Sequence, residues 1–96
     1  MRLQSPHFVL YAGQIDDDAR GGALGITVSR RIGNAVARNR VKRRVRECYR
    51  RSLRERLPAG LAIVVIARTG AAALDFDALA AELHDTAAKL KEKLAR

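Results

Sequence analysis

Residues 34–57 read NAVARNRVKRRVRECYRRSLRERL, the longest stretch of the chain with a helical pattern. Wound at about 100° per residue, this stretch gathers its apolar and small side chains within an arc of about 120°. The resulting stripe consists of Ala37, Val41, Val45, Cys48, Tyr49 and Ser52. The pattern predicts a helix from residue 34 to about residue 57 that packs this stripe on a sheet, and Pro58 and Gly60 end it.

Three segments outside this helix are typical of strands. Residues 7–14 (HFVLYAGQ) combine β-branched and aromatic side chains, and residues 23–30 (ALGITVSR) alternate as expected of a second strand, antiparallel to the first. Residues 61–68 (LAIVVIAR) are a continuous apolar run followed by Arg68, which predicts a strand buried on both faces. Residues 15–22 hold three Asp and a Gly-Gly pair, as expected of a loop.

The C-terminal segment has the period of an amphipathic helix. Its apolar stripe consists of Phe76, Leu79, Ala80, Leu83, Ala87, Leu90 and Leu94. Asp75 is the expected N-cap, and lysines near the C-terminal end suit the helix dipole. The order β-β-α-β-α predicts an α+β fold, a two-layer α/β sandwich, and 96 residues predict a single domain, residues 1–96.

Composition excludes several classes of protein. The longest apolar run, residues 61–67, is too short to cross a bilayer, and the N-terminus has no pattern of a secretory signal. Cys48 is the one cysteine, so no internal disulfide can form, and no Cys/His cluster has the spacing of a zinc site. We therefore expect a cytoplasmic protein without membrane association and without a metal of its own.

Positive charge is concentrated in one segment. The chain has 19 Lys and Arg against ten Asp and Glu, for a net charge of +9. Twelve of the basic residues lie between Arg30 and Arg56, with only Glu47 and Glu55 among them. Because the remainder of the chain is almost neutral, the charge indicates a localised binding surface for an anionic partner.

On the predicted helix this charge lies opposite the apolar stripe. One exposed face consists of Asn39, Lys42, Arg43, Arg46 and Arg50, and a second row consists of Arg40, Arg44 and Arg51, with Glu47 between the two. Eleven of the twelve basic residues are Arg, whose guanidinium forks bind phosphates in a bidentate manner. A merely solvated helix would be served by mixed charges, and a membrane-binding helix would need Trp, Phe or Leu on its stripe. A nucleic acid is therefore the favoured partner.

Composition favours RNA over DNA. No short partner helix precedes the basic helix, as a helix-turn-helix would require. The four aromatic residues are too few for a sheet that stacks several bases, so the basic helix is the candidate interface.

Five short motifs follow one another in register over residues 29–47. They are Ser29-Arg30-Arg31, Gly33-Asn34-Ala35-Val36, Arg38-Asn39-Arg40, Lys42-Arg43 and Arg46-Glu47. In this order they resemble the bacterial ribonuclease P protein subunit, and the likeness extends from residue 7 to about residue 92. The apolar strand ending in Ala67 and Arg68 and the amphipathic helix after it fit the same family.

The resemblance implies both a fold and a function. The fold is a small mixed sheet with the basic helix in a left-handed βαβ crossover, like domain 2 of ribosomal protein S5. Such a subunit would bind the catalytic RNA of RNase P and the 5′ leader of precursor tRNA, while the RNA with its bound Mg²⁺ removes the leader. The protein would supply no catalytic residue, bind no cofactor or metal alone and require no protein partner.

The resemblance also implies which residues bind. Contacts to the catalytic RNA would come from Arg30, Arg31, Asn34, Arg38, Asn39, Arg40, Lys42, Arg43 and Arg46, and Arg50 joins them from the exposed helix face. The leader would lie in a cleft on the sheet lined by Tyr11 or Phe8. Alternation along the strand places these two rings on opposite faces, so we expect one of them in the cleft and favour Tyr11. Gly33 would supply the backbone freedom to turn from strand to helix.

One departure and two alternatives remain. Family members usually begin with an extra helix that forms one wall of the leader cleft, whereas this chain begins at Met1-Arg2-Leu3, so either the start is truncated or this is a short form of the family. A ribosomal or other structural RNA-binding protein is the main alternative. A protein nuclease is the other, but the Asp residues of the chain lie in settings where Asp is common in loops and helix caps.

Overall fold

The computed structural model describes residues 1–14, 24–58 and 60–94, so the loop predicted for residues 15–22 lies outside the described residues. The strands are β1 (Arg2–Gln4), β2 (Phe8–Gln14), β3 (Leu24–Val28) and β4 (Leu61–Ala67). The helices are α1 (Ala35–Cys48), the π-helical turn η2 (Tyr49–Leu53), α2 (Arg54–Arg56) and α3 (Phe76–Leu94), with 3₁₀ turns at η1 (Arg30–Ile32) and η3 (Ala71–Ala73).

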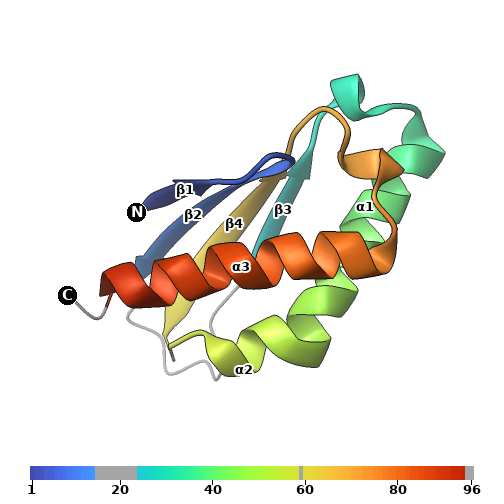
Figure 1. Ribbon diagram of the computed structural model, residues 1–96. Helices are drawn as coiled ribbons and strands as arrows, with labels where there is room; N and C mark the ends of the chain where they lie inside the picture. The colour runs from blue at the N-terminus through green and yellow to red at the C-terminus, as the bar shows by residue number, and fades with distance from the viewer. Residues whose placement is uncertain (15–23, 59, 95–96) are drawn as a thin grey trace.

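The four strands form one mixed sheet in the order β1-β2-β4-β3. β2 is antiparallel to β1 and to β4, and β3 is parallel to β4. With the helical layer toward the viewer and β3 and β4 pointing up, β4 lies to the left of β3, so the crossover through α1 is left-handed (Figure 1). The predicted two-layer α+β fold is confirmed. β3 runs antiparallel to β2 as predicted, but β4 lies between them. The strand β1 was not predicted, because three residues are too few to show the alternation of a strand.

The prediction that the strand at residues 61–68 is buried on both faces is wrong. Side chains of β4 alternate strictly between a buried and a more open position. The buried ones are Leu61, Ile63, Val65 and Ala67, whereas Val64 is 37% exposed. The physical reason is that the helices pack on one face of the sheet only (Figure 1), so the other face stays open. Tyr11 of β2, 43% exposed, is paired with Val64 on this open face.

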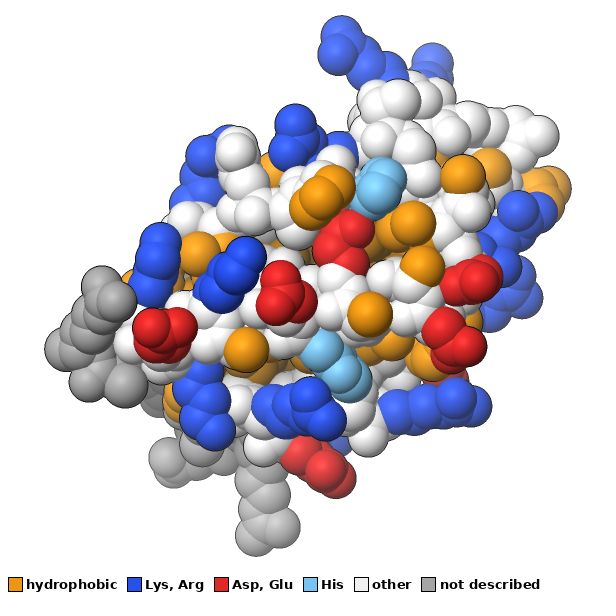
Figure 2. Space-filling model, viewed as in Figure 1, with side chains coloured by type: hydrophobic (Ala, Val, Ile, Leu, Met, Phe, Trp, Pro, Cys, Tyr) orange, Lys and Arg blue, Asp and Glu red, His pale blue; other side chains and the backbone are white. Residues whose placement is uncertain are grey.

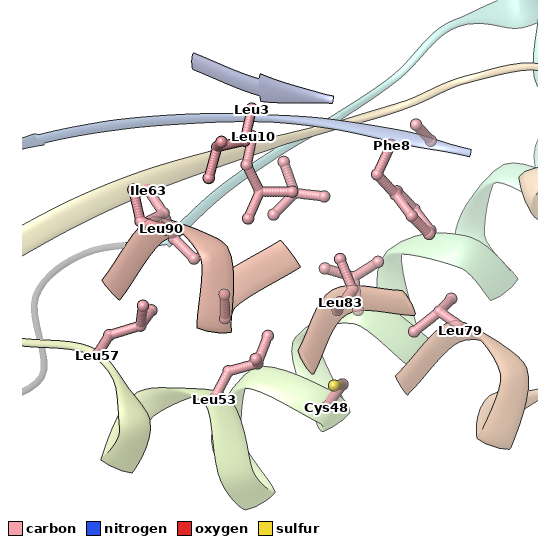
Figure 3. Packing of buried hydrophobic residues seen from close by; sticks show 14 of the residues in the cluster. Leu3, Phe8, Leu10, Cys48, Leu53, Leu57, Ile63, Leu79, Leu83 and Leu90 are labelled. Carbon is pink, nitrogen blue, oxygen red and sulfur yellow. The ribbon is translucent and has the colours of Figure 1, made fainter. Parts of the chain in front are cut away.

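The core lies between the sheet on one side and α1, η2 and α3 on the other. Figure 3 shows Leu79, Leu83 and Leu90 of α3 directed toward side chains of the strands and of α1. Burial of one such Leu contributes about 1.5–3 kcal/mol to the free energy of unfolding. The predicted cap of α3 is confirmed, since the Oδ1 of Asp75 accepts a hydrogen bond from the Ala78 amide at 2.8 Å. Leu94, in the last turn, remains 38% exposed.

The basic helix follows its predicted bounds but not its predicted stripe. Val41, Val45 and Cys48 are buried as expected; beyond them Leu53 is buried and Ser52 is only half-buried. The cause is the π-helical turn η2, in which the Arg54 amide bonds to the Tyr49 carbonyl five residues back. A π-helical turn holds more residues than an α-helical turn, so the buried position moves from the fourth to the fifth residue after Cys48.

A carboxylate of α3 anchors the connection between β1 and β2. Glu82 Oε2 accepts hydrogen bonds from the Ser5 hydroxyl at 2.5 Å and from the His7 amide at 2.8 Å, and Oε1 lies 2.8 Å from His7 Nδ1. Burial alone would raise the pKa of Glu82, but the hydrogen bonds from Ser5 and His7 outweigh it and lower that pKa below its ordinary value. The ionised carboxylate therefore ties the edge of the sheet to α3.

We expect Glu82→Gln to lower the free energy of unfolding by about 1–3 kcal/mol at pH 7, because it removes the charged acceptor of three contacts. Because the pKa of Glu82 is lowered in the folded state, its contribution is complete above the unfolded pKa of about 4.3 and is lost as the pH falls through the folded value. Urea denaturation at pH 7 and at decreasing pH below about 4 measures this. Asp85→Asn, at an exposed carboxylate of the same helix, is the matched control. If the difference in the free energy of unfolding between wild type and Glu82→Gln does not become smaller in acid, the stabilising role of the ionised Glu82 carboxylate is wrong.

Candidate nucleic-acid interface

Two residues, Gly33 and Asn34, set the start of the basic helix. Gly33 has φ 148°, and a Cβ at that position would lie 3.0 Å from the Ala37 Cβ, so glycine is required where the chain turns from η1 into α1. Asn34 is extended, and its side-chain oxygen accepts a hydrogen bond from the Ala37 amide at 2.9 Å. The prediction for Gly33 is confirmed. Asn34 acts as the N-cap, a role that the sequence analysis did not assign to it.

Most of the predicted face of α1 lines one hollow. The hollow has a volume of about 560 Å³ and is lined by Val36, Asn39, Lys42, Arg43 and Arg46. Sequence reasoning missed Val36, which is 66% exposed. Its spacing from Asn39 and Arg43, three and seven residues, is the signal that places it on the same helix face. The face therefore combines three cations and an amide with one apolar side chain.

Glu47 lies between the two basic rows and pairs with one arginine of each. One oxygen of Glu47 lies 2.7 Å from Arg51 Nε and the other 2.5 Å from Arg50 Nη2. Arg50 is thus tethered to an acid on its own helix and does not line the hollow around Asn39. A further hollow of about 390 Å³ is lined by Arg40, Arg43, Arg44, Glu47 and Phe76.

The two arginines ahead of the helix are placed apart from its face. Arg30 and Arg31 are exposed in η1, and Arg31 lines a third hollow, of about 300 Å³. Its walls are Pro6, Ser29, Arg31, Ala67, Arg68 and Thr69. Sequence reasoning missed Arg68 as a site residue. Because β3 and β4 are parallel, the residues after each strand meet at one edge of the sheet, and this pairing is the signal that would have found Arg68.

Arg38 lies at the border between the buried and the exposed sides of α1. It is half-buried, and its Nε is buried without a hydrogen-bond partner among the described residues. Of the predicted RNA-binding residues, Arg38 and Lys42 are half-buried, whereas Arg43 and Arg46 are exposed.

The two candidate leader-binding aromatics are on opposite faces, as alternation predicts. Phe8 is fully buried in the core, so the suggestion that it lines a cleft is wrong; it faces the helices. Tyr11 is on the open face, where its hydroxyl accepts a hydrogen bond from Arg2 Nε at 3.2 Å and its ring lies 5.9 Å from the Arg2 guanidinium carbon. An aromatic ring and a cation thus stand side by side on the open sheet.

Two further titratable groups, Cys48 and His84, take part in packing or hydrogen bonding within the fold. Cys48 is 1% exposed, and burial raises the pKa of its thiol despite a hydrogen bond from Ser52 and the charge of Arg56. The Nε2 of His84 lies 2.5 Å from the Ser52 hydroxyl, and burial together with the charge of Arg56 lowers the pKa of His84. Within residues 1–14, 24–58 and 60–94, no three His, Cys, Asp or Glu side chains gather as metal ligands would. In the same residues, no helix combines the length and apolarity that a bilayer crossing needs.

The distribution of charge on α3, which crosses the front of the molecule in Figure 1, differs from that on α1. In Figure 2, acidic side chains lie among basic ones across α3, so no single sign of charge dominates there. Excess positive charge is therefore a property of α1 and the turns on either side of it.

Comparison with known proteins identifies the arrangement. The family model Ribonuclease P matches residues 1–91. The chain belongs to the ribonuclease P protein family. The ribonuclease P protein component of Geotalea uraniireducens is 43% identical over 89 residues, covering 93% of this chain and 75% of that protein. The corresponding component of Brevibacillus brevis is 47% identical over 72 residues, covering 75% of this chain and 56% of the relative.

Solved structures of the family have the same fold. The RNase P protein of Thermotoga maritima superimposes with a TM-score of 0.79 at 35% identity, over 88% of this chain and 80% of that one. The RNase P protein of Staphylococcus aureus gives a TM-score of 0.81 at 28% identity, over 95% and 81%. Members of the ribonuclease P protein family are components of an endoribonuclease holoenzyme that processes tRNA 5′ ends, in which the RNA subunit is the catalyst.

We expect Asn34→Ala to lower the free energy of unfolding by about 0.5–2 kcal/mol, the usual cost of losing an N-cap. Asn34→Asp keeps the acceptor oxygen and is expected to remain within a few tenths of a kcal/mol of wild type. Thermal denaturation followed by circular dichroism measures both. Equal losses in the two variants would show that the side-chain oxygen of Asn34 does not hold the helix start.

Proposed function

We propose that this chain acts as the protein subunit of ribonuclease P, binding the catalytic RNA through α1 and the 5′ leader of precursor tRNA on the open face of the sheet. The observation that carries the proposal is the concentration of arginines on one exposed helix in a chain of this family. We place the activity in the cytoplasm and expect the protein to require no protein partner.

The face around Asn39 is suited to a folded RNA. Arg43 and Arg46 present guanidinium forks that match phosphate oxygens, and Asn39 can both donate to and accept from a base edge or a ribose hydroxyl. Because Val41 and Val45 on the opposite side of α1 are buried, the helix is held rigidly and these groups are presented in a fixed spacing. Little ordering is then required when the RNA binds.

The open face is suited to a single strand. Single-stranded RNA binds where bases can lie on aromatic or apolar side chains beside a cation. Tyr11 and Val64 supply the exposed apolar surface, and Arg2 supplies the charge. We propose that the leader lies across these residues.

Family membership implies a reaction that depends on Mg²⁺, but the side chains of the basic face of α1 are not suited to bind this ion. Mg²⁺ prefers oxygen ligands, and the carboxylate within the basic rows of α1, Glu47, has both oxygens engaged by Arg50 and Arg51. We therefore propose that Mg²⁺, which supplies the charge stabilisation for phosphodiester hydrolysis, is bound mainly by the RNA. The arginines of α1 would order phosphates by neutralising them.

The affinity for a bacterial RNase P RNA is expected to be strongly salt-dependent. Six phosphate contacts would give a slope of about −4 to −5 in log affinity against log salt concentration. Replacing Arg43 and Arg46 together by Ala should make this slope shallower by about 1.5, since two contacts are lost. Filter binding at several salt concentrations measures the slope.

The matched control is the double variant Lys91→Ala, Lys93→Ala, which removes the same charge from exposed positions of α3. It should leave both affinity and slope close to wild type. If both double variants behave alike, net charge rather than the face of α1 governs binding, and the proposed interface is wrong.

Reconstitution tests the function as a whole. With a bacterial RNase P RNA and a precursor tRNA at low Mg²⁺, adding the protein should restore leader cleavage, whereas the protein alone should cleave nothing. The double variant of Arg43 and Arg46 should need more Mg²⁺ for half-maximal cleavage, because fewer phosphates are neutralised. A protein that binds RNA without stimulating cleavage would instead be a structural RNA-binding protein, and cleavage by the protein alone would make it a nuclease.

A further inference from the structure

A second hollow adjoins the proposed RNA face and contains an aromatic wall. It is formed between α1 and the first residue of α3, Phe76, and its other walls are Arg40, Arg43, Arg44 and Glu47. Arg43 lines this hollow and also the one around Asn39, so the two are neighbours. No function described above uses Phe76.

The walls of the hollow are held in place. Phe76 is half-buried and packs against the core, and the Arg51 guanidinium carbon lies 5.5 Å from the centre of its ring. Arg51 is fixed in turn by Glu47, at 2.7 Å. On the other side, the Arg44 guanidinium donates a hydrogen bond to the Leu74 carbonyl, just ahead of α3. The ring therefore lies among oriented guanidinium groups rather than freely moving ones.

The charge of the hollow is unbalanced. Arg40 and Arg43 are exposed, and neither has an ion-pair partner among the described residues. Glu47 is the acid of the hollow, and its charge is shared between Arg50 and Arg51. An occupant should therefore carry negative charge to meet Arg40 and Arg43, together with a flat apolar part to lie against Phe76.

We infer that this hollow binds one unpaired nucleotide of the RNA, with its base against Phe76 and its phosphate on Arg40 and Arg43. A nucleotide combines an anion with a flat ring, and bases splayed out of an RNA fold stack on aromatic rings and guanidinium planes. Because Arg43 is shared with the face around Asn39, an RNA strand bound there can continue directly into the hollow. This inference rests on the proposed function and adds a base-stacking subsite to it.

The absence of tryptophan from the sequence allows a direct test. In Phe76→Trp the single indole reports on the hollow alone, and stacking of a base on it should quench its fluorescence. The probe is a bacterial RNase P RNA transcript added at low salt. Leu94→Trp, at an exposed position in the last turn of α3, is the control and should not be quenched on binding.

Affinity separates stacking from charge. Phe76→Leu should weaken binding of the same RNA about tenfold, the size expected for one base–aromatic stack, with an unchanged salt slope. Phe76→Tyr keeps a ring and should bind within about twofold of wild type. Arg40→Gln should instead make the salt slope shallower by about 0.7–0.9, the amount for one phosphate contact. Circular dichroism establishes that each variant is folded before its affinity is used.

Two results would overturn the subsite: no quenching of the indole of Phe76→Trp when the RNA binds, or Phe76→Leu binding as tightly as wild type. If instead the proposed function is wrong, the wild-type protein will not stimulate cleavage of precursor tRNA at low Mg²⁺. If wild type stimulates cleavage and the Arg43, Arg46 double variant loses affinity while Phe76→Leu does not, the interface stands and the subsite does not.

Discussion

Packing of the apolar stripe of α1 against the sheet and α3 is the contact on which the rest of the structure depends. Val41, Val45, Cys48 and Leu53 are buried along one side of the helical segment, so the arginines between them must point away from the core. Like charges along one helix face repel, and this repulsion opposes helix formation. Burial of the stripe and the cap at Asn34 offset it, and the charged groups are left in a fixed array on the surface.

The arrangement divides the molecule into surfaces with different chemistry. The helical layer covers one side of the sheet, and α1 lies at its edge beside β3 (Figure 1). Arg43 and Arg46 on its basic face are exposed. The opposite side of the sheet keeps Tyr11 and Val64 exposed. A folded RNA and a single strand could therefore be bound at the same time without competing for the same side chains, which is what a subunit that joins an RNA catalyst to its substrate requires.

Glu47 and Glu82 show how few acids are needed to organise so basic a chain. Glu47 gathers Arg50 and Arg51 and so aligns Arg51 over Phe76, whereas Glu82 ties the connection between β1 and β2 to α3. Both oxygens of each carboxylate are engaged within the chain, at Glu47 by Arg50 and Arg51 and at Glu82 by Ser5 and His7.

The sequence by itself determined the order of the elements after β1, the bounds of the basic helix and the face that carries Asn39, Arg43 and Arg46, because these follow from local periodicity. Tertiary structure decided what depends on neighbours distant in the chain. Phe8 is buried and Val64 is exposed because the helices cover one face of the sheet only, and Leu53 rather than Ser52 is buried because a π-helical turn inserts an extra residue. Arg68 meets Arg31, and Phe76 meets Arg51, through the parallel pairing of β3 with β4 and the packing of α3 on α1. No local pattern encodes those meetings, since each joins residues at least 25 positions apart in the sequence.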